Sequence, residues 1–180
     1  AYGENSAYIY VRNASNAWLQ EARLHVSTPN FGYSVSIDVA GSRAIVGAPG
    51  ENAVYIYTRN ASNAWTQEAR LNISFSSSFF GYSVSINTDS NRVIVGAPGV
   101  SSAYIYTHNA SNAWLQETRL NVPTSATFGN SVSIDAGGNR VVVGAPNENA
   151  AYIYARNASN AWPQEVRLNV IGSSQFGYAV

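Results

Sequence analysis

The chain has 180 residues, of which 46% are hydrophobic and only 11% are charged. Ten basic residues, all arginine, balance ten acidic residues, so the sequence lacks the basic surface that nucleic acids and anionic membranes attract. It has no cysteine and no apolar stretch near the ~20 residues of a membrane span, which excludes a disulfide scaffold, a thiolate site and membrane insertion.

The first elements expected along the chain are four short strands. Residues 7–12 are aromatic and β-branched, residues 17–24 alternate in polarity, and the segment 13–16 between them has the composition of a turn. This pattern predicts a hairpin. Residues 31–37 and 43–47 predict two further strands, joined by a polar link that contains glycine.

The same pattern recurs with a period of about 48 residues. Its tryptophans are separated by 47, 49 and 48 residues. Four antiparallel strands per repeat of this length are typical of a β-propeller blade. We therefore predict an all-β propeller of ~48-residue blades in a single domain 1–180. Its parts would be a half blade at 1–26, complete blades at 31–73, 80–122 and 128–170, and a partial strand at 176–180.

Two short motifs carry a family resemblance. Each repeat contains Phe-Gly followed by Gly-Ala-Pro, at 31–32 with 47–49, at 80–81 with 96–98, and at 128–129 with 144–146. This order resembles the FG-GAP repeat of the integrin alpha-chain propeller. The resemblance implies an extracellular or cell-surface module for adhesion, and calcium loops between the first two strands of a blade.

The turns that correspond to those calcium loops are poor in carboxylates. Calcium takes six to eight oxygen ligands. The middle turn offers Asn87, Asp89 and Asn91 at alternate positions, with a single carboxylate. It is a weak calcium candidate, and ordinary turn chemistry is the preferred interpretation. We expect no cofactor.

The aromatic residues of each repeat predict packing. Tyr8 and Tyr10 share one face of a strand and Ile9 the other. Glu21 and Arg23 are also two apart, which predicts that they share a face in a cross-strand ion-pair network. The tryptophans are expected between blades, with sugar stacking as the alternative. The ligand-binding candidates are Trp18, Trp65, Trp114 and Trp162, with Arg12, Arg59 and Arg156.

Five Asn-x-Ser sequons are present. Four lie in the repeated hairpin turn and one lies outside it. In a eukaryotic secretory pathway they would be glycosylation acceptors, and otherwise the repeated four are turn chemistry alone. The candidate asparagines are Asn13, Asn60, Asn72, Asn109 and Asn157.

No catalytic constellation emerges from the sequence. His25 and His108 occupy different positions of the repeat, and the serine-rich strand lacks the Gly-x-Ser-x-Gly pattern of a nucleophile elbow. We expect a non-enzymatic extracellular interaction or adhesion module with a protein or glycan ligand at the cell surface or matrix. The alternatives are a multivalent lectin with equivalent sites in each repeat, and a structural repeat unit of a larger extracellular assembly.

The strand count leaves incomplete blades at both ends. Incomplete blades expose unpaired strand edges, which tend to pair with other chains. We therefore expect self-association, or that these repeats are part of a longer repeat chain.

Overall fold

The computed structural model describes residues 2–122, 127–170, 172 and 175–180. Its strands form three four-stranded antiparallel sheets and one two-stranded hairpin. The hairpin pairs β1 (Ser6–Arg12) with β2 (Trp18–His25), and we call it the head hairpin.

Each four-stranded sheet is built from four consecutive strands and forms one blade. Blade 1 contains β3 (Ser34–Ile37), β4 (Arg43–Ala48), β5 (Ala53–Arg59) and β6 (Trp65–Asn72). Blade 2 contains β7 (Ser83–Ile86), β8 (Arg92–Ala97), β9 (Ser102–His108) and β10 (Trp114–Asn121). Blade 3 contains β11 (Val132–Ile134), β12 (Arg140–Ala145), β13 (Ala150–Ala155) and β14 (Gln164–Asn169). Short 3-10 turns are η1 (Tyr2–Glu4), η2 (Pro49–Glu51), η3 (Pro98–Val100) and η4 (Pro146–Glu148).

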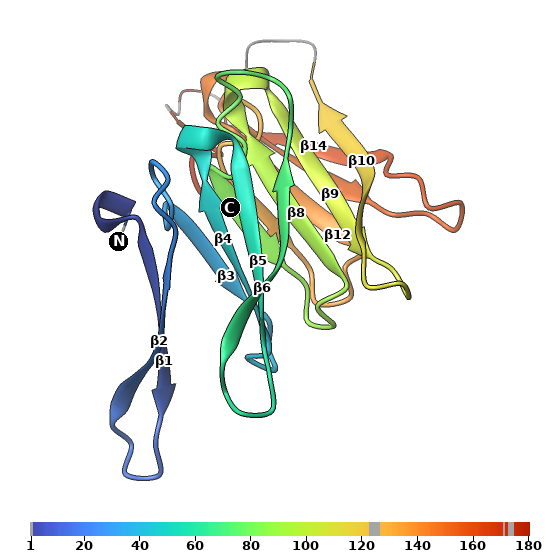
Figure 1. The fold of residues 1–180 in the computed structure, drawn as a ribbon. Helices are drawn as coiled ribbons and strands as arrows, with labels where there is room; N and C mark the ends of the chain where they lie inside the picture. The colour runs from blue at the N-terminus through green and yellow to red at the C-terminus, as the bar shows by residue number, and fades with distance from the viewer. Residues whose placement is uncertain (1, 123–126, 171, 173–174) are drawn as a thin grey trace.

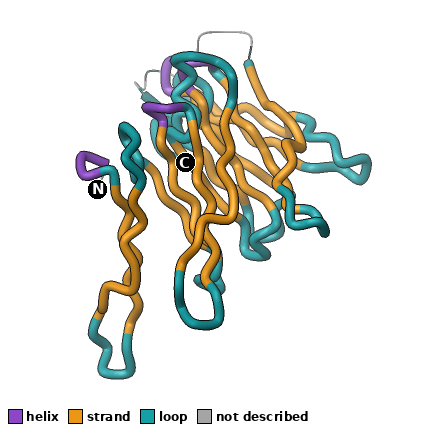
Figure 2. The backbone as a smooth tube through the Cα atoms, viewed as in Figure 1, coloured by secondary structure: helices purple, strands orange, loops and turns teal. Residues whose placement is uncertain are grey.

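The blades follow one another in chain order from the head hairpin, which is blue in Figure 1, to blade 3. Figure 2 shows that turns and loops gather at the two ends of the strands. No helix of the described residues is long and apolar enough to cross a membrane. The predicted fold class, an all-β propeller of four-stranded antiparallel blades, is confirmed.

One predicted element is different. Residues 176–180, which we call the tail segment, form a turn and not a strand. Tyr178 N donates to Gln175 O at 3.0 Å within this turn. In the complete blades the first strand pairs with the second strand of its own blade, as Ser34 does with Gly47. The same turn precedes the first strand of each complete blade, where Tyr33 N donates to Asn30 O at 3.2 Å and Tyr82 N to Phe79 O at 3.0 Å. Only residues 179–180 therefore correspond to first-strand positions, and the described chain supplies no second strand with which they could pair.

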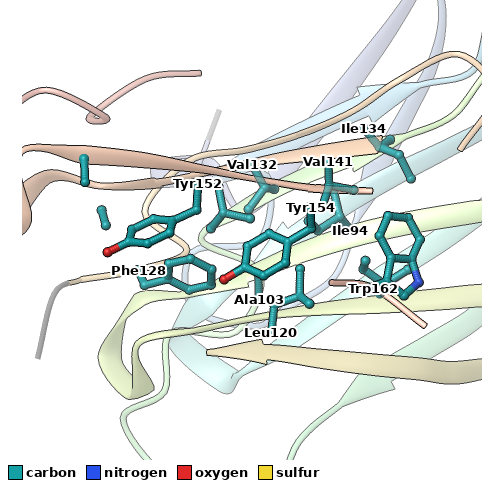
Figure 3. Close-up of a cluster of buried hydrophobic side chains, with 14 residues drawn as sticks. Ile94, Ala103, Leu120, Phe128, Val132, Ile134, Val141, Tyr152, Tyr154 and Trp162 are labelled. Carbon is teal, nitrogen blue, oxygen red and sulfur yellow. The ribbon is translucent and has the colours of Figure 1, made fainter. Parts of the chain in front are cut away.

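The core lies between neighbouring blades. Ile45, Val54 and Ile56 of blade 1 pack against Val84 and Val93 of blade 2. The second strand of each blade is almost entirely apolar because both of its faces are buried, with 0% exposure at Ile45, Ile94 and Val141. Figure 3 shows the equivalent cluster of blades 2 and 3, in which Phe128 lies beside Tyr152 and Tyr154.

The Phe-Gly and Gly-Ala-Pro motifs meet where two blades touch. A Cβ atom on Gly47 would lie 2.0 Å from the carbonyl oxygen of Gly81 in the next blade, which is too close for any side chain. Gly81 itself has φ +92°, a conformation that favours glycine. These glycines therefore allow close contact between adjacent blades.

Candidate functional site

A β-bulge changes the direction of the glutamate side chain in the last strand of the head hairpin and of each blade. In the head hairpin Ile9 pairs with Ala22 and Tyr10 with Gln20, so Glu21 has no partner in the register. The extra residue breaks the alternation of faces. Arg23 turns to its own hairpin, where its Nε donates to Ser6 Oγ at 3.0 Å.

The prediction that Glu21 and Arg23 share a face in one ion-pair network is therefore wrong. The physical reason is the bulge, which recurs at Glu68, Glu117 and Glu165. Each of these glutamates pairs with arginines at other positions of the repeat.

Glu21 connects the head hairpin to blade 1. Its carboxylate accepts hydrogen bonds from Arg59 Nε at 2.8 Å and Trp65 Nε1 at 2.7 Å. These two hydrogen bonds lower the pKa of Glu21. Arg59 and Trp65, both ligand-binding candidates, are thus engaged at this junction.

Glu117 makes the corresponding contacts between blades 2 and 3. It accepts hydrogen bonds from Arg92 at 2.9 Å, Arg156 at 2.5 Å and Trp162 at 3.2 Å. Burial favours its neutral form, but the three donors outweigh burial, and the pKa of Glu117 is lowered. Trp162 is only 7% exposed, so its ring offers no open face for stacking a sugar.

The junction of blades 1 and 2 has His108 in place of the arginine. Glu68 is held by Arg43 through bonds of 2.7 and 3.0 Å. His108 Nε2 lies 3.0 Å from Glu68 Oε1 but forms no well-directed hydrogen bond. Trp114 Nε1 is buried without a hydrogen-bond partner, and the Arg43 guanidinium lies 5.6 Å from its ring centre.

Two ligand-binding candidates lie outside these junctions. Trp18 is 67% exposed, and Arg12 is exposed beside it at the end of the head hairpin, where the register pairs the two residues. The seven candidates are therefore divided between three inter-blade junctions and one uncovered face.

The first strands of the three blades, β3, β7 and β11, lie next to one another at the inner edge of the blades. Serine hydroxyls link them: Ser36 Oγ accepts from Ile86 N at 3.3 Å, and Ser85 Oγ accepts from Ile134 N at 3.3 Å. Ser34 Oγ donates to Gly81 O at 2.8 Å. This arrangement places the residues that follow each Phe-Gly pair at one end of the centre.

Those residues form what we call the central mouth: Tyr33, Tyr82, Asn130 and Tyr178. The rings of Tyr33 and Tyr82 lie 4.8 Å apart, centre to centre, at 44°. Asn130 Nδ2 donates to Tyr178 O at 3.0 Å. Tyr178 is 57% and Tyr33 37% exposed. The central mouth thus presents aromatic rings and polar groups to solvent.

The central mouth was not predicted from the sequence, in which Tyr33 and its equivalents fall within a predicted strand. Their common position directly after Phe-Gly was the available signal, because equivalent positions of a propeller blade converge around one axis.

The calcium candidates lie in a turn at the opposite end of the first strands. Asn87 Oδ1 accepts from the backbone N–H groups of Asn91 at 3.1 Å and Arg92 at 2.8 Å, and Asn87 Nδ2 donates to Asn91 Oδ1 at 2.9 Å. Asp38 makes the same backbone bonds in blade 1. Asp89 is exposed. Among the described residues, no three His, Asp or Glu side chains gather as a metal site would need.

The four repeated sequon asparagines close their hairpin turns. Asn13 Oδ1 accepts from Ser15 N at 3.0 Å and Ala17 N at 2.9 Å. Asn60, Asn109 and Asn157 make the same pair of bonds. Asn72 is exposed at the end of β6. Glycosylation of these residues stays a prediction.

No family model and no curated protein matches the chain. Solved structures do resemble it. A candidate 6-phosphogluconolactonase from Bacteroides uniformis aligns with a TM-score of 0.74 and 9% identity over 94% of this chain and 53% of that chain. The periplasmic gluconolactonase PpgL of Pseudomonas aeruginosa aligns at 0.69 and 15% over 96% and 50%. A Lactobacillus plantarum protein aligns at 0.72 and 14% over 93% and 52%. This chain spans about half the length of these proteins.

These comparisons overturn three expectations. The resemblance to FG-GAP repeats is wrong, because three of the similar structures carry lactonase names and none of those compared carries an integrin name. For the same reason the expectations of a non-enzymatic adhesion module and of no enzymatic activity are wrong. The Phe-Gly and Gly-Ala-Pro motifs have a physical explanation that is independent of family, since they form the close contact between adjacent blades.

Proposed function

We propose that this chain belongs to a propeller that binds and hydrolyses a sugar lactone at its central mouth. The observation that carries the proposal is the likeness of nearly the whole chain to propellers named as lactonases. At 9 to 15% identity that likeness establishes the fold, so the assignment of chemistry rests on what the central mouth offers.

The central mouth suits a sugar ring. Tyr33 and Tyr82 offer aromatic faces, and such faces pack against the C–H groups of a sugar while hydroxyl and amide groups nearby form hydrogen bonds. None of the four mouth residues is a lysine or an arginine. Phosphate groups in proteins are usually bound by such cations. The mouth therefore favours a neutral lactone over a phosphorylated one.

Hydrolysis of a lactone requires water to add to the acyl carbon and the ring C–O bond to break. The products are a hydroxyl group and a carboxylic acid, which releases a proton at neutral pH. Negative charge develops on the carbonyl oxygen in the transition state, and hydrogen-bond donors aimed at that oxygen lower the barrier. The tyrosine hydroxyls and the second N–H of the Asn130 amide are the side-chain donors that the four mouth residues offer.

The test uses D-glucono-1,5-lactone and follows proton release with a pH indicator, in weak buffer, with and without added calcium. We expect hydrolysis above the spontaneous rate and at least a tenfold loss in the double variant Tyr33→Ala, Tyr82→Ala. Phe75→Ala is the control, since Phe75 is 54% exposed on the connector beside Arg119 and away from the mouth. Hydrolysis at the spontaneous rate under both conditions would refute the proposal.

A further inference from the structure

The head hairpin and the tail segment each lack the blade strands that the other could supply. We propose that two copies of this chain associate head to tail, so that the tail segment of each copy and the head hairpin of the other form one composite blade. Contacts between neighbouring blades within the chain are the template for this junction, which is independent of what the central mouth binds.

The first complementary feature is an aromatic clasp. In every complete blade a fully buried phenylalanine meets two tyrosines of the third strand edge-on. Ring centres are 5.3 and 6.4 Å apart around Phe31, 5.5 and 6.2 Å around Phe80, and 5.4 and 6.2 Å around Phe128.

The ends hold the two halves of this clasp separately. The head hairpin has Tyr8 and Tyr10 in the tyrosine positions, and Tyr10 is 53% exposed where its counterpart Tyr57 is 7% exposed. The tail segment has Phe176, which is only partly buried where Phe31 is 0% exposed. Each end thus presents the group that the other lacks.

The tail segment is already seated as the first strand of a next blade would be. A Cβ atom on Gly144 would lie 1.9 Å from Gly177 O, as one on Gly47 would lie 2.0 Å from Gly81 O. Ser131 Oγ donates to Gly177 O at 3.0 Å, which repeats the bond from Ser34 to Gly81. Blade 3 therefore positions Phe176 for a clasp in the adjoining blade.

The second complementary feature is an ion cluster. The pair Arg140–Glu165 of blade 3 has side-chain exposures of 57% and 45%, whereas the equivalent pair Arg92–Glu117 has 14% and 10%. The difference arises because Glu117 is covered by Arg156 and Trp162 of the following blade.

The head hairpin carries the missing partners. Arg12 and Trp18 occupy the positions of Arg156 and Trp162 in the repeat, and both are exposed. A head hairpin docked beside blade 3 would thus supply a cation and an indole to Glu165. The two surfaces match in charge, in chemistry and in their place in the repeat.

We expect the head hairpin to meet the tail segment of a second copy and not the tail segment of its own chain. The chain covers 52% and 53% of the chains of two similar structures, so its three blades and head hairpin correspond to about half of such a fold. Head and tail therefore point to opposite ends of a half ring. A two-fold axis through the centre brings each head to the other copy's tail, and both junctions are then identical, so the assembly closes.

The composite blade leaves one position open. It has a first strand from the tail segment and an outer pair from the head hairpin, but no counterpart of β4. An apolar cleft of about 370 Å³ marks this position, lined by Ala7, Ile9 and Leu24 on one side and Val35 and Ile37 on the other. We therefore expect these junctions to be weaker than the internal ones, and association to depend on protein concentration.

The test is sedimentation equilibrium of the 180-residue chain over a hundredfold range of concentration. We expect a species of twice the 19.3 kDa chain mass. Arg12→Glu and Glu165→Arg alone should each weaken association at least tenfold. An equimolar mixture of the two variants should restore it, because one junction is then native and the other carries the exchanged charges.

Asp89→Arg is the control, since Asp89 is exposed in the turn between β7 and β8. This substitution changes the net charge by the same amount as Glu165→Arg. It should leave association unchanged, and circular dichroism should show that all variants fold. A monomer at every concentration, as expected if these faces take further blades of a longer polypeptide, would overturn the proposal. So would a dimer insensitive to both variants, a mixture that does not recover, or open polymers in place of a closed dimer.

Discussion

The first strand of blade 1 lies next to the head hairpin, and the first strand of blade 2 lies next to blade 1. The two strands have the same sequence and opposite environments. Val84 and Ile86 of blade 2 are 7% and 8% exposed, whereas Val35 and Ile37 of blade 1 are 62% and 50% exposed. The local sequence Ser-Val-Ser-Ile is identical at both places. Burial in this fold is therefore decided by the preceding blade and not by the strand itself, as expected of a protein whose repeats contact only their neighbours.

Alkaline pH should disrupt the blades with buried tyrosines most strongly. Burial raises the pKa of Tyr57, Tyr106 and Tyr154 from 10.0 to about 12. A raised folded-state pKa gives stability that is complete below the unfolded value and is lost as pH rises through the folded value. Between pH 10 and 12 we expect a loss of about 2 kcal/mol for each tyrosine.

Urea unfolding followed by circular dichroism at pH 8, 10 and 11.5 measures this loss. Tyr154→Phe is the matched variant, since it removes one ionisable group and keeps the ring. The variant should lose less stability than the parent between pH 8 and 11.5. An equal loss in both would show that Tyr154 does not titrate as its burial requires.

The phenylalanines separate a complete blade from an incomplete one. Phe80→Ala removes a ring with 0% exposure and should cost about 3 to 5 kcal/mol of unfolding free energy. Phe176→Ala, at the same position of the repeat, should cost less than about 1 kcal/mol in the monomer because Phe176 lacks its two tyrosines. Urea unfolding at low protein concentration compares the two variants, and equal costs would remove the distinction between inner and terminal positions.

The sequence predicted most of the fold because its signals are local or periodic. Alternation of polarity located the strands, and the 48-residue period located the blades. The orientation of Glu21 was not predictable in this way, since it depends on a bulge in the pairing with the neighbouring strand. The same holds for the exposure of Val35, which depends on an adjacent blade, and for the central mouth around Tyr33, which forms only when three blades converge.

Neutralising a glutamate between two blades should lower the free energy of unfolding more than neutralising the equivalent glutamate on the exposed face of blade 3. Glu117→Gln weakens charge-assisted hydrogen bonds from Arg92 and Arg156 at a site with 10% exposure, and we expect a loss of about 1 to 3 kcal/mol. Glu165→Gln affects an exposed pair and should cost less than about 0.5 kcal/mol in the monomer.

Acid should reproduce the effect at Glu117. Its pKa is lowered from the usual 4.5, so its contribution is present above that pH and is lost as the pH falls through the folded value. Thermal melts of the parent and Glu117→Gln at pH 7 and pH 3 test this. The difference between the two proteins should shrink at pH 3, and a constant difference would contradict the lowered pKa.

The smallest expected effect concerns a difference between the inner blades. The hydroxyls of Tyr55 and Tyr152 donate to Glu51 and Glu148, whereas Tyr104 is 2% exposed and its hydroxyl has no hydrogen-bond partner. The cause is in the sequence, because blade 2 has Val100 where blades 1 and 3 have glutamate. A buried hydroxyl without a hydrogen-bond partner lowers the free energy of unfolding, and blades 1 and 3 do not have this loss.

Val100→Glu should therefore stabilise the protein by about 1 kcal/mol, since the new carboxylate can accept from the Tyr104 hydroxyl and lie near Arg119, as Glu51 lies 3.6 Å from Arg70. A double-mutant cycle with Tyr104→Phe, followed by urea unfolding, isolates the hydrogen bond. Tyr104→Phe should be nearly neutral in the parent and should remove the gain in Val100→Glu. A gain that persists without the hydroxyl would have to come from the ion pair with Arg119, and the missing hydrogen bond of blade 2 would then carry no measurable cost.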